Sequence, residues 1–209
     1  MAIFKTNQKE LLLDSTRPIG ETLNTLNGRP ETTSAGVLPQ CQESTQQRWY
    51  VLRATYAREL KVQDHMREQG LCTFIPMMWK EKKLVPAITG LVFVNATRDQ
   101  LDSYIRSFGD ARPVNYYWDR TANRPLTVPD KAMEDFISIA STMDPDLIYL
   151  TEISDKLREG QKVIVKEGPF KGVEGKVVRI RKSRRIMVEI PGMLAVASTY
   201  VEMSNVEII

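Results

Sequence analysis

The spacing of apolar positions changes at about residue 47. Residues 1–47 are rich in Thr, Ser, Gln, Pro and Gly and contain a single aromatic side chain, Phe4. Such a segment cannot bury enough apolar surface to offset the entropy of ordering it. The pattern predicts a polar N-terminal extension, flexible or loosely docked.

Dense apolar runs and helical periodicities alternate from residue 48 onward. Pro76 lies inside one apolar run, so that strand must lie at a sheet edge or bend there. Thr97 and Gln100 form a capping-box signature that opens a helix, and Pro129 with Asp130 opens another. The order β-α-β-β-α-β-β-α predicts an α+β domain over 48–145, with a mainly antiparallel sheet and helices on one face. We expect strands over 48–55, 71–79, 88–94, 114–118 and 126–128, and helices over 58–69, 99–107 and from 130.

The segment 88–94 (ITGLVFV) is apolar on both faces of a strand. Gly90, Val92 and Val94 would lie on one face of the strand, and Leu91 and Phe93 on the other. Two interpretations remain open. The strand is buried on both faces, or Leu91 and Phe93 form an exposed apolar patch of the kind that marks a partner site.

The last quarter of the chain has a shorter rhythm. Short β runs at 162–165, 174–180, 185–190, 194–198 and 206–209 are separated by glycine turns. Five short strands in about 50 residues are typical of a small closed barrel, which hides its sheet edges. We therefore predict a linker over 146–158 and a barrel domain over 159–209.

Composition is that of an average soluble globular protein, with 42% hydrophobic and 26% charged residues. No apolar run is long enough for a transmembrane helix, and the first residues lack the features of a secretory signal. Cys41 and Cys72 are too few for a disulfide framework and are expected as reduced thiols. These observations predict a cytoplasmic location.

Positive charge is concentrated in residues 155–209, which carry 11 basic and 7 acidic side chains. It is densest over 179–185, where five of seven residues are Arg or Lys. Such a run is able to contact phosphate. A solvated turn between two strands explains it equally well.

Little in the sequence supports catalysis. His65 is the only histidine, and it is expected on the exposed side of a helix. The cysteines lack neighbours at zinc-ligand spacing. Asp144 and Asp146 are interpreted as turn residues, not as metal ligands. The glycine-rich stretch 168–176 has the wrong spacing for a phosphate loop, and a strand follows it instead of a helix. We predict no enzymatic activity, no metal and no cofactor.

Two motifs resemble one known family. Residues 49–52 (WYVL), followed by a helix and by 88–94, are similar to the N-terminal domain of NusG-type transcription elongation factors. Residues 163–177 (VIVKEGPFKGVEGKV) resemble the KOW motif of the same family. Residues 52–56, 126–130 and 200–202 look closest to UpxY-like specialised paralogues, which antiterminate operons for surface and capsular polysaccharide synthesis. The resemblance implies an α/β N-terminal domain linked to a five-stranded SH3-like barrel.

The resemblance also implies partners and contact residues. In NusG-type factors the N-terminal domain seats an apolar surface on the clamp helices of the largest RNA polymerase subunit. That surface falls on Leu91 and Phe93, with Arg53 nearby, although Leu91 replaces the usual aromatic residue. The helix 99–107 matches the element that faces the opposite jaw, with Ser103 and Tyr104 as candidates.

The barrel is implied to be a recruitment module. In the family it contacts a ribosomal protein or a termination factor. For the protein as a whole, an antagonist protein, nascent RNA or non-template DNA are further candidate partners. Gly168, Gly172 and Gly175 are interpreted as turn formers. Phe170 is either core or loop contact. The basic candidates for nucleic-acid contact are Arg179, Arg181, Lys182, Arg184 and Arg185.

Three functional hypotheses follow. The first is an operon-specific antiterminator that binds RNA polymerase and suppresses pausing or termination. The second is a general elongation factor that couples polymerase to the ribosome or to a termination factor. The third is an RNA-binding KOW protein that acts away from polymerase.

Overall fold

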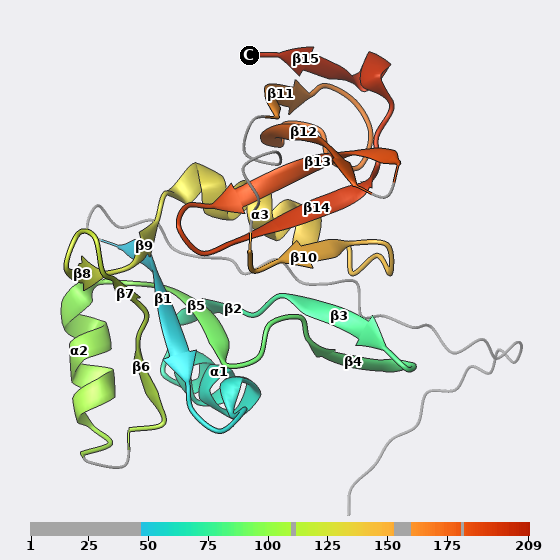
Figure 1. Ribbon diagram of the computed structural model, residues 1–209. Helices are drawn as coiled ribbons and strands as arrows, with labels where there is room; N and C mark the ends of the chain where they lie inside the picture. Colours follow the sequence, from blue (N-terminus) through green and yellow to red (C-terminus); the bar gives the residue numbers. More distant parts are fainter. Residues whose placement is uncertain (1–46, 110–111, 153–159, 181) are drawn as a thin grey trace, which may run out of the picture. The chain divides into compact units, whose positions relative to one another are not determined.

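The computed structural model describes residues 47–109, 112–152, 160–180 and 182–209 (Figure 1). The predicted N-terminal extension therefore lies outside the described residues, apart from its last position. So do Arg181 and residues 153–158 of the predicted linker.

The first sheet is antiparallel, with strand order β2-β5-β1-β6 and with β9 also paired to β1. β1 and β5 pair over six positions, from Arg48 opposite Ala96 to Arg53 opposite Leu91. The strands are β1 (Arg48–Ala54), β2 (Cys72–Phe74), β5 (Leu91–Ala96), β6 (Val114–Tyr116) and β9 (Thr127–Val128).

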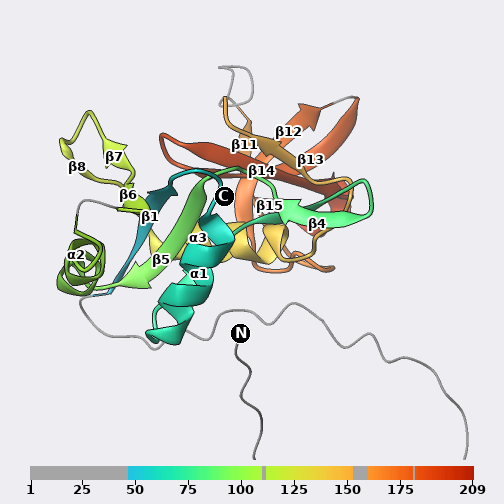
Figure 2. The same ribbon diagram turned by 90° about the horizontal axis from the view of Figure 1, so that it is seen from below.

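Helices cover both faces of this sheet. α1 (Glu59–Glu68) and α2 (Arg98–Arg106) pack on the face that carries Leu52, Val92 and Val94. α3 (Asp130–Ala140) packs on the other face, against Val51 and Phe93 (Figures 1 and 2). The expectation of helices on one face is therefore wrong. Both apolar faces of β1 and β5 need to be covered, because leaving apolar area exposed to water costs free energy.

Two small hairpins accompany the sheet. β3 (Met77–Lys80) pairs with β4 (Lys83–Pro86), and β7 (Trp118–Asp119) pairs with β8 (Arg124–Pro125). The strand predicted over 71–79 is interrupted between β2 and β3, so the bend expected at Pro76 is confirmed. The strand predicted from residue 88 begins at Leu91, since Gly90 adopts φ +73° in a turn.

The second sheet has six strands in the order β10-β14-β13-β12-β11-β15. All five predicted β runs of the barrel domain form strands. The sixth, β10 (Ile148–Leu150), lies inside the predicted linker and pairs with β14. The others are β11 (Gln161–Val165), β12 (Glu174–Ile180), β13 (Ser183–Ile190), β14 (Leu194–Tyr200) and β15 (Val206–Ile208), with a 3₁₀ turn, η1 (Met203–Asn205), before β15.

α3 packs on strands of both sheets. It contacts β1 of the first sheet and β12, β13 and β14 of the second. One apolar cluster runs from Val51 and Phe93 through Phe136 to Val188 and Val196. The Lys131 Nζ donates a hydrogen bond to the Gly172 carbonyl at 2.9 Å, which ties the start of α3 to the glycine turn before β12.

Two of the three glycines interpreted as turn formers lie in turns. Gly168 and Gly172 have φ of +90° and +86° and are confirmed as turn formers. Gly175 instead lies in β12, where an added Cβ would sit 2.6 Å from Ile186 Cγ2.

Cys72 is disulfide-bonded, so the expected reduced thiol is wrong, while Cys41 lies outside the described residues. In the part of the chain that is described, no helix is long and apolar enough to cross a membrane.

Candidate functional site

Leu91 and Phe93 are buried. Their side chains are 4% and 0% exposed, respectively, although the sequence left an exposed patch open as an alternative. Both belong to the apolar cluster shared with α3 and the barrel strands. The face predicted to seat on polymerase is therefore closed in this conformation.

An aromatic cluster of three rings closes this face. The ring centroids of Phe93 and Phe136 are 5.6 Å apart, and those of Phe74 and Phe136 are 6.2 Å apart with the rings nearly perpendicular. The Phe74 and Phe93 centroids are separated by 6.5 Å. Tilted and edge-to-face pairs at these distances add favourable energy beyond the area they bury. Phe136 therefore anchors α3 on β5.

Arg53 lies at the open margin of the same face. It stands opposite Leu91 on β5 and opposite Asn115 on β6, so all three project to one side of the sheet. The Arg53 and Asn115 side chains are exposed. Arg53 makes no side-chain hydrogen bond or ion pair with any other residue that is described here. It therefore offers a free cation beside the closed apolar face.

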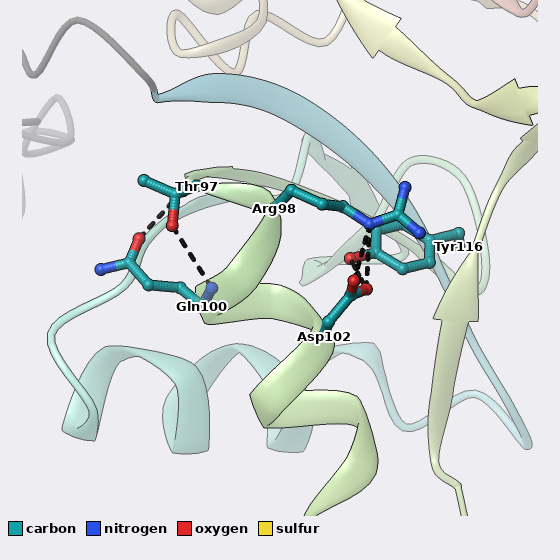
Figure 3. A network of polar contacts seen from close by, with 5 residues as sticks. All are labelled: Thr97, Arg98, Gln100, Asp102 and Tyr116. Carbon is teal, nitrogen blue, oxygen red and sulfur yellow. Dashed lines mark hydrogen bonds and ion pairs between the residues drawn. The ribbon is translucent and has the colours of Figure 1, made fainter.

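α2 is held by two polar networks (Figure 3). At its start, the Gln100 backbone N–H donates to Thr97 Oγ1 and the Thr97 N–H donates to Gln100 Oε1, so the predicted capping box is confirmed. One turn later the Arg98 Nε donates to the Asp102 carboxylate at 3.0 Å. The Tyr116 hydroxyl donates to the same carboxylate at 2.8 Å, which joins α2 to β6. These contacts fix the helix that carries Ser103 and Tyr104.

The Asp102 carboxyl titrates below its ordinary range. Burial alone would raise its pKa, but the hydrogen bonds from Tyr116 and Arg98 and the charge of Arg98 outweigh burial and lower it. The same hydrogen bond, added to burial, raises the pKa of the Tyr116 hydroxyl. Asp102 is therefore a carboxylate that accepts hydrogen bonds from two donors, Arg98 and Tyr116.

Ser103 and Tyr104 differ in accessibility. Ser103 is exposed, whereas Tyr104 is buried and its hydroxyl lies 3.0 Å from His65 Nδ1. Burial raises the pKa of the Tyr104 hydroxyl. Both residues line a surface cavity of about 530 Å³ between the end of α1 and α2, together with Gln69 and Asp99. His65 is half-buried against Phe108, so the expectation of an exposed histidine is wrong.

Phe170 belongs to the core. It is 5% exposed and packs in the cluster that links α3 to the barrel, which decides between the two interpretations left open by the sequence. As a contact residue for a partner, Phe170 is therefore not available in this conformation. The neighbouring Gly172 carbonyl is occupied by Lys131.

The basic run forms the β12–β13 hairpin turn. Arg179 and Arg184 are exposed and stand directly opposite each other, and Lys182 occupies the turn with φ +68°. Arg185 is used differently, because its Nη1 donates to the Asp146 and Ser198 carbonyls at 2.7 and 2.8 Å. Arg185 is thus a structural residue. Arg181 lies outside the described residues.

The sequence alone does not distinguish the half-exposed tryptophans on the two small hairpins from buried ones. Trp79 is 50% exposed on β3 and Trp118 is 46% exposed on β7. The apolar runs predict strands that contain Trp79 and Trp118, but they do not indicate which side of each strand is buried. Among the residues described, no group of three or more His, Cys, Asp or Glu is arranged to hold a metal ion.

Comparisons with known proteins agree with the two motifs. Residues 47–137 match the family model described as transcription termination factor NusG, and residues 159–189 match that of the KOW motif. A solved structure entitled "Domain interaction in Thermotoga maritima NusG" is 18% identical with a TM-score of 0.43, covering 77% of this chain and 96% of that one. No curated protein matches the chain.

The two family matches fall on the two sheet regions of the chain. Residues 47–137 are similar to the NusG family model and residues 159–189 to the KOW motif, in the order that the sequence predicted. Its fold is NusG-like, with mixed helices and antiparallel sheets and with a C-terminal sheet consistent with a KOW barrel.

Truncation of the central ring tests the closed face. Phe93→Ala should lower the free energy of unfolding by about 3–5 kcal/mol, because it leaves a cavity between β5 and α3. Urea unfolding followed by circular dichroism measures this loss. Arg53→Ala, at an exposed position, should change stability by less than about 0.5 kcal/mol. Equal midpoints for Phe93→Ala and the parent chain would contradict a buried ring.

The Asp102 network predicts a pH dependence of stability. A lowered pKa in the folded state means that the carboxylate stabilises the fold above its unfolded pKa of about 3.9 and loses this contribution as the pH falls through the folded value. The parent chain should therefore be more stable than Asp102→Asn at neutral pH, with the difference shrinking below about pH 4. Thermal unfolding across this range measures it. A difference that is independent of pH would exclude an ionised Asp102 as the cause.

Proposed function

We propose that this chain is a non-enzymatic transcription factor of the NusG family that binds RNA polymerase through residues 48–145 and suppresses pausing or termination. The observation that carries the proposal is the succession of the two matched regions, 47–137 and 159–189. We place the protein in the cytoplasm, together with the polymerase that it is proposed to bind.

The candidate polymerase contact is the face of Leu91, Phe93 and Arg53. Strand register puts the three side chains on one side of the sheet, at adjacent positions of β5 and β1. Ser103 on α2, with Tyr104 beneath it, is the candidate second contact. Phe93 and Arg53 belong to residue types that are enriched in protein interfaces.

Polymerase binding through Leu91 and Phe93 requires the face to open. Both side chains are buried beneath α3 in the described conformation. Only the surplus of binding energy over the cost of exposing this cluster would appear as affinity, because the competent state is a minor one. Arg53 is accessible in either state and is therefore a candidate for the first contact.

We further propose that the factor is specialised for operons of surface or capsular polysaccharide synthesis. This rests on the similarity of residues 52–56, 126–130 and 200–202 to UpxY-like paralogues. The barrel would then recruit a ribosomal protein, a termination factor or an antagonist. A general NusG-like elongation factor is the alternative. The two differ in polymerase occupancy, which is confined to one or a few operons for a specialised factor and spread over most transcribed genes for a general one.

An RNA-binding role away from polymerase is the remaining alternative. Arg179 and Arg184 are exposed, directly opposed and without ion pairs to other described residues. Phosphate contact by such a pair would make binding strongly salt-dependent.

Charge reversal at Arg53 tests the proposed face without damaging the core. Arg53→Glu should weaken capture of purified RNA polymerase core by about tenfold, or about 1.4 kcal/mol, because it places an unfavourable charge at the margin of the contact. The matched control is Lys61→Glu, on the exposed side of α1, which packs on the opposite face of the sheet. Capture in a pull-down by the full-length chain measures both.

The outcomes separate the hypotheses. Loss of polymerase capture with Arg53→Glu, together with normal capture with Lys61→Glu, supports the proposed polymerase contact at this face. Equal capture by both variants and the parent would remove Arg53 from the contact. Absence of capture by the parent chain, even at high polymerase concentration, would favour the role away from polymerase.

A further inference from the structure

The surface cavity of about 530 Å³ lies between the C-terminal end of α1 and one side of α2. Its volume falls within the range of about 300–1,000 Å³ that small-molecule sites occupy. Gln69 follows the last residue of α1, and Leu71 directly precedes β2. The other lining residues belong to α2 or directly follow it: Asp99, Gln100, Ser103, Tyr104 and Ser107. Two neighbouring segments of one domain therefore form its walls.

The polar side chains that α2 contributes to the cavity form one stripe. Asp99, Ser103 and Ser107 are four residues apart, which places them on the same side of the helix. All three residues are exposed. Arg98 and Asp102 lie on another side of α2, where they pair with each other (Figure 3). The stripe is thus separate from the network that fixes α2 in place.

Hydrogen-bonding groups of both kinds remain available in the cavity. The Asp99 carboxylate and the Ser103 hydroxyl make no hydrogen bond to another residue in the described part of the chain. Gln100 uses its Oε1 in the capping box, which leaves its side-chain NH₂ group. The Gln69 Nε2 lies 3.4 Å from His65 Nε2, which leaves the Gln69 Oε1. Unused donors and acceptors therefore line the same cavity.

The charge of the lining selects the class of ligand. Among the described residues that line the cavity, Asp99 is charged and none is Lys or Arg. A phosphate would therefore lie beside the Asp99 carboxylate without a cation to bind it. An ammonium group would pair with Asp99 but would leave the Gln100 and Ser103 donors without an acceptor. A hydroxyl both donates and accepts, so neighbouring hydroxyls of a neutral ligand match the whole set.

The apolar part of the lining is held in place before any ligand binds. Tyr104 is buried, and its hydroxyl lies 3.0 Å from His65 Nδ1. Its ring packs edge-on against Phe108, with a centroid distance of 5.1 Å. Leu71 beside it is half-buried. Side chains that are already fixed lose little conformational entropy when a ligand binds.

We propose that the cavity between α1 and α2 binds a small neutral carbohydrate. The Asp99 carboxylate accepts hydrogen bonds from two neighbouring hydroxyls, and Gln100 and Ser103 donate to oxygens of the sugar. The C–H face of the sugar ring packs against Leu71 and Tyr104. An acidic side chain binds a ribose hydroxyl in the same way in dinucleotide-binding folds.

A bound sugar would cover Ser103, the candidate second contact with polymerase. This consequence rests on the proposed function, whereas sugar binding itself rests on the cavity. The experiment therefore contains no polymerase, so failure of the sugar site can be told from failure of the proposed function.

The test titrates the isotope-labelled, full-length chain with glucose, galactose, mannose and N-acetylglucosamine and follows the backbone amide signals by nuclear magnetic resonance. At least one sugar should give saturable shifts centred on residues 69–71 and 99–107. The 6-phosphate of the sugar that binds best is the matched charged probe. It should bind about tenfold more weakly than the neutral sugar, because its charge is repelled by Asp99.

Two variants test the polar contacts. Asp99→Asn should weaken sugar binding by about tenfold, since the amide accepts through one oxygen only, and Ser103→Ala should weaken it by about fivefold. The matched control is Ser138→Ala, an exposed serine on α3 outside the cavity, whose hydroxyl donates to the Glu134 carbonyl. The amide spectra of the free variants show directly whether each one is folded.

Saturable shifts at the cavity, weaker binding of the phosphorylated sugar and selective loss with Asp99→Asn and Ser103→Ala together support the site. Absence of saturable shifts with every sugar up to about 10 mM, where little binding free energy remains, overturns the proposal. Tighter binding of the phosphorylated sugar overturns the ligand class. Unchanged affinity in both cavity variants, or an equal loss with Ser138→Ala, overturns the assignment of these residues.

Discussion

The antiparallel pairing of β1 with β5 is the constraint on which the rest of the structure depends. Both strands carry large apolar residues on both sides, so their register decides which side chains meet which helix. A shift of one residue would exchange the two faces. With the observed register, Val92 and Val94 meet α1 and α2, whereas Leu91 and Phe93 are left for α3. Phe136 closes this second face through its contact with Phe93.

Closure of the second face connects the two matched regions of the chain. α3 uses Phe136 toward the first sheet and packs on β13 and β14 of the barrel. At its start, Lys131 bridges the Asp135 carboxylate at 2.6 Å and the Gly172 carbonyl. Burial raises the pKa of Asp135, although the hydrogen bond from Lys131 opposes this. Polar and apolar contacts thus join the face proposed for polymerase to the turn of the KOW domain.

Much of the fold could be predicted because local signals and tertiary packing agree. Alternating and dense apolar runs located the barrel strands, the Thr97–Gln100 capping box located α2, and Pro76 located a bend. The covering of Leu91 and Phe93 could not be predicted, because an apolar strand face fits a helix of the same chain as well as a partner. β10 was missed because three residues with intermediate burial carry little periodicity.

Side-chain roles were harder to predict than elements. The basic run over 179–185 reads as uniform charge, yet Arg185 is held by two carbonyls while Arg179 and Arg184 remain exposed. Trp79 is expected in a strand, but the sequence does not show that it lies on the same hairpin as the lysines that follow it. Cross-strand register, which brings Trp79 to Leu84 and Lys80 to Lys83, is information that only the fold supplies.

The most direct test of the closed face is a measurement of proximity between the Phe93 and Phe136 rings in the free, full-length chain. Nuclear Overhauser contacts between selectively labelled phenylalanine rings report such distances. A ring separation of 5.6 Å between centroids predicts clear cross-peaks between Phe93 and Phe136, with further ones from Phe74. Absence of cross-peaks between Phe93 and Phe136, with the Phe93 ring accessible to a soluble paramagnetic probe, would contradict the account.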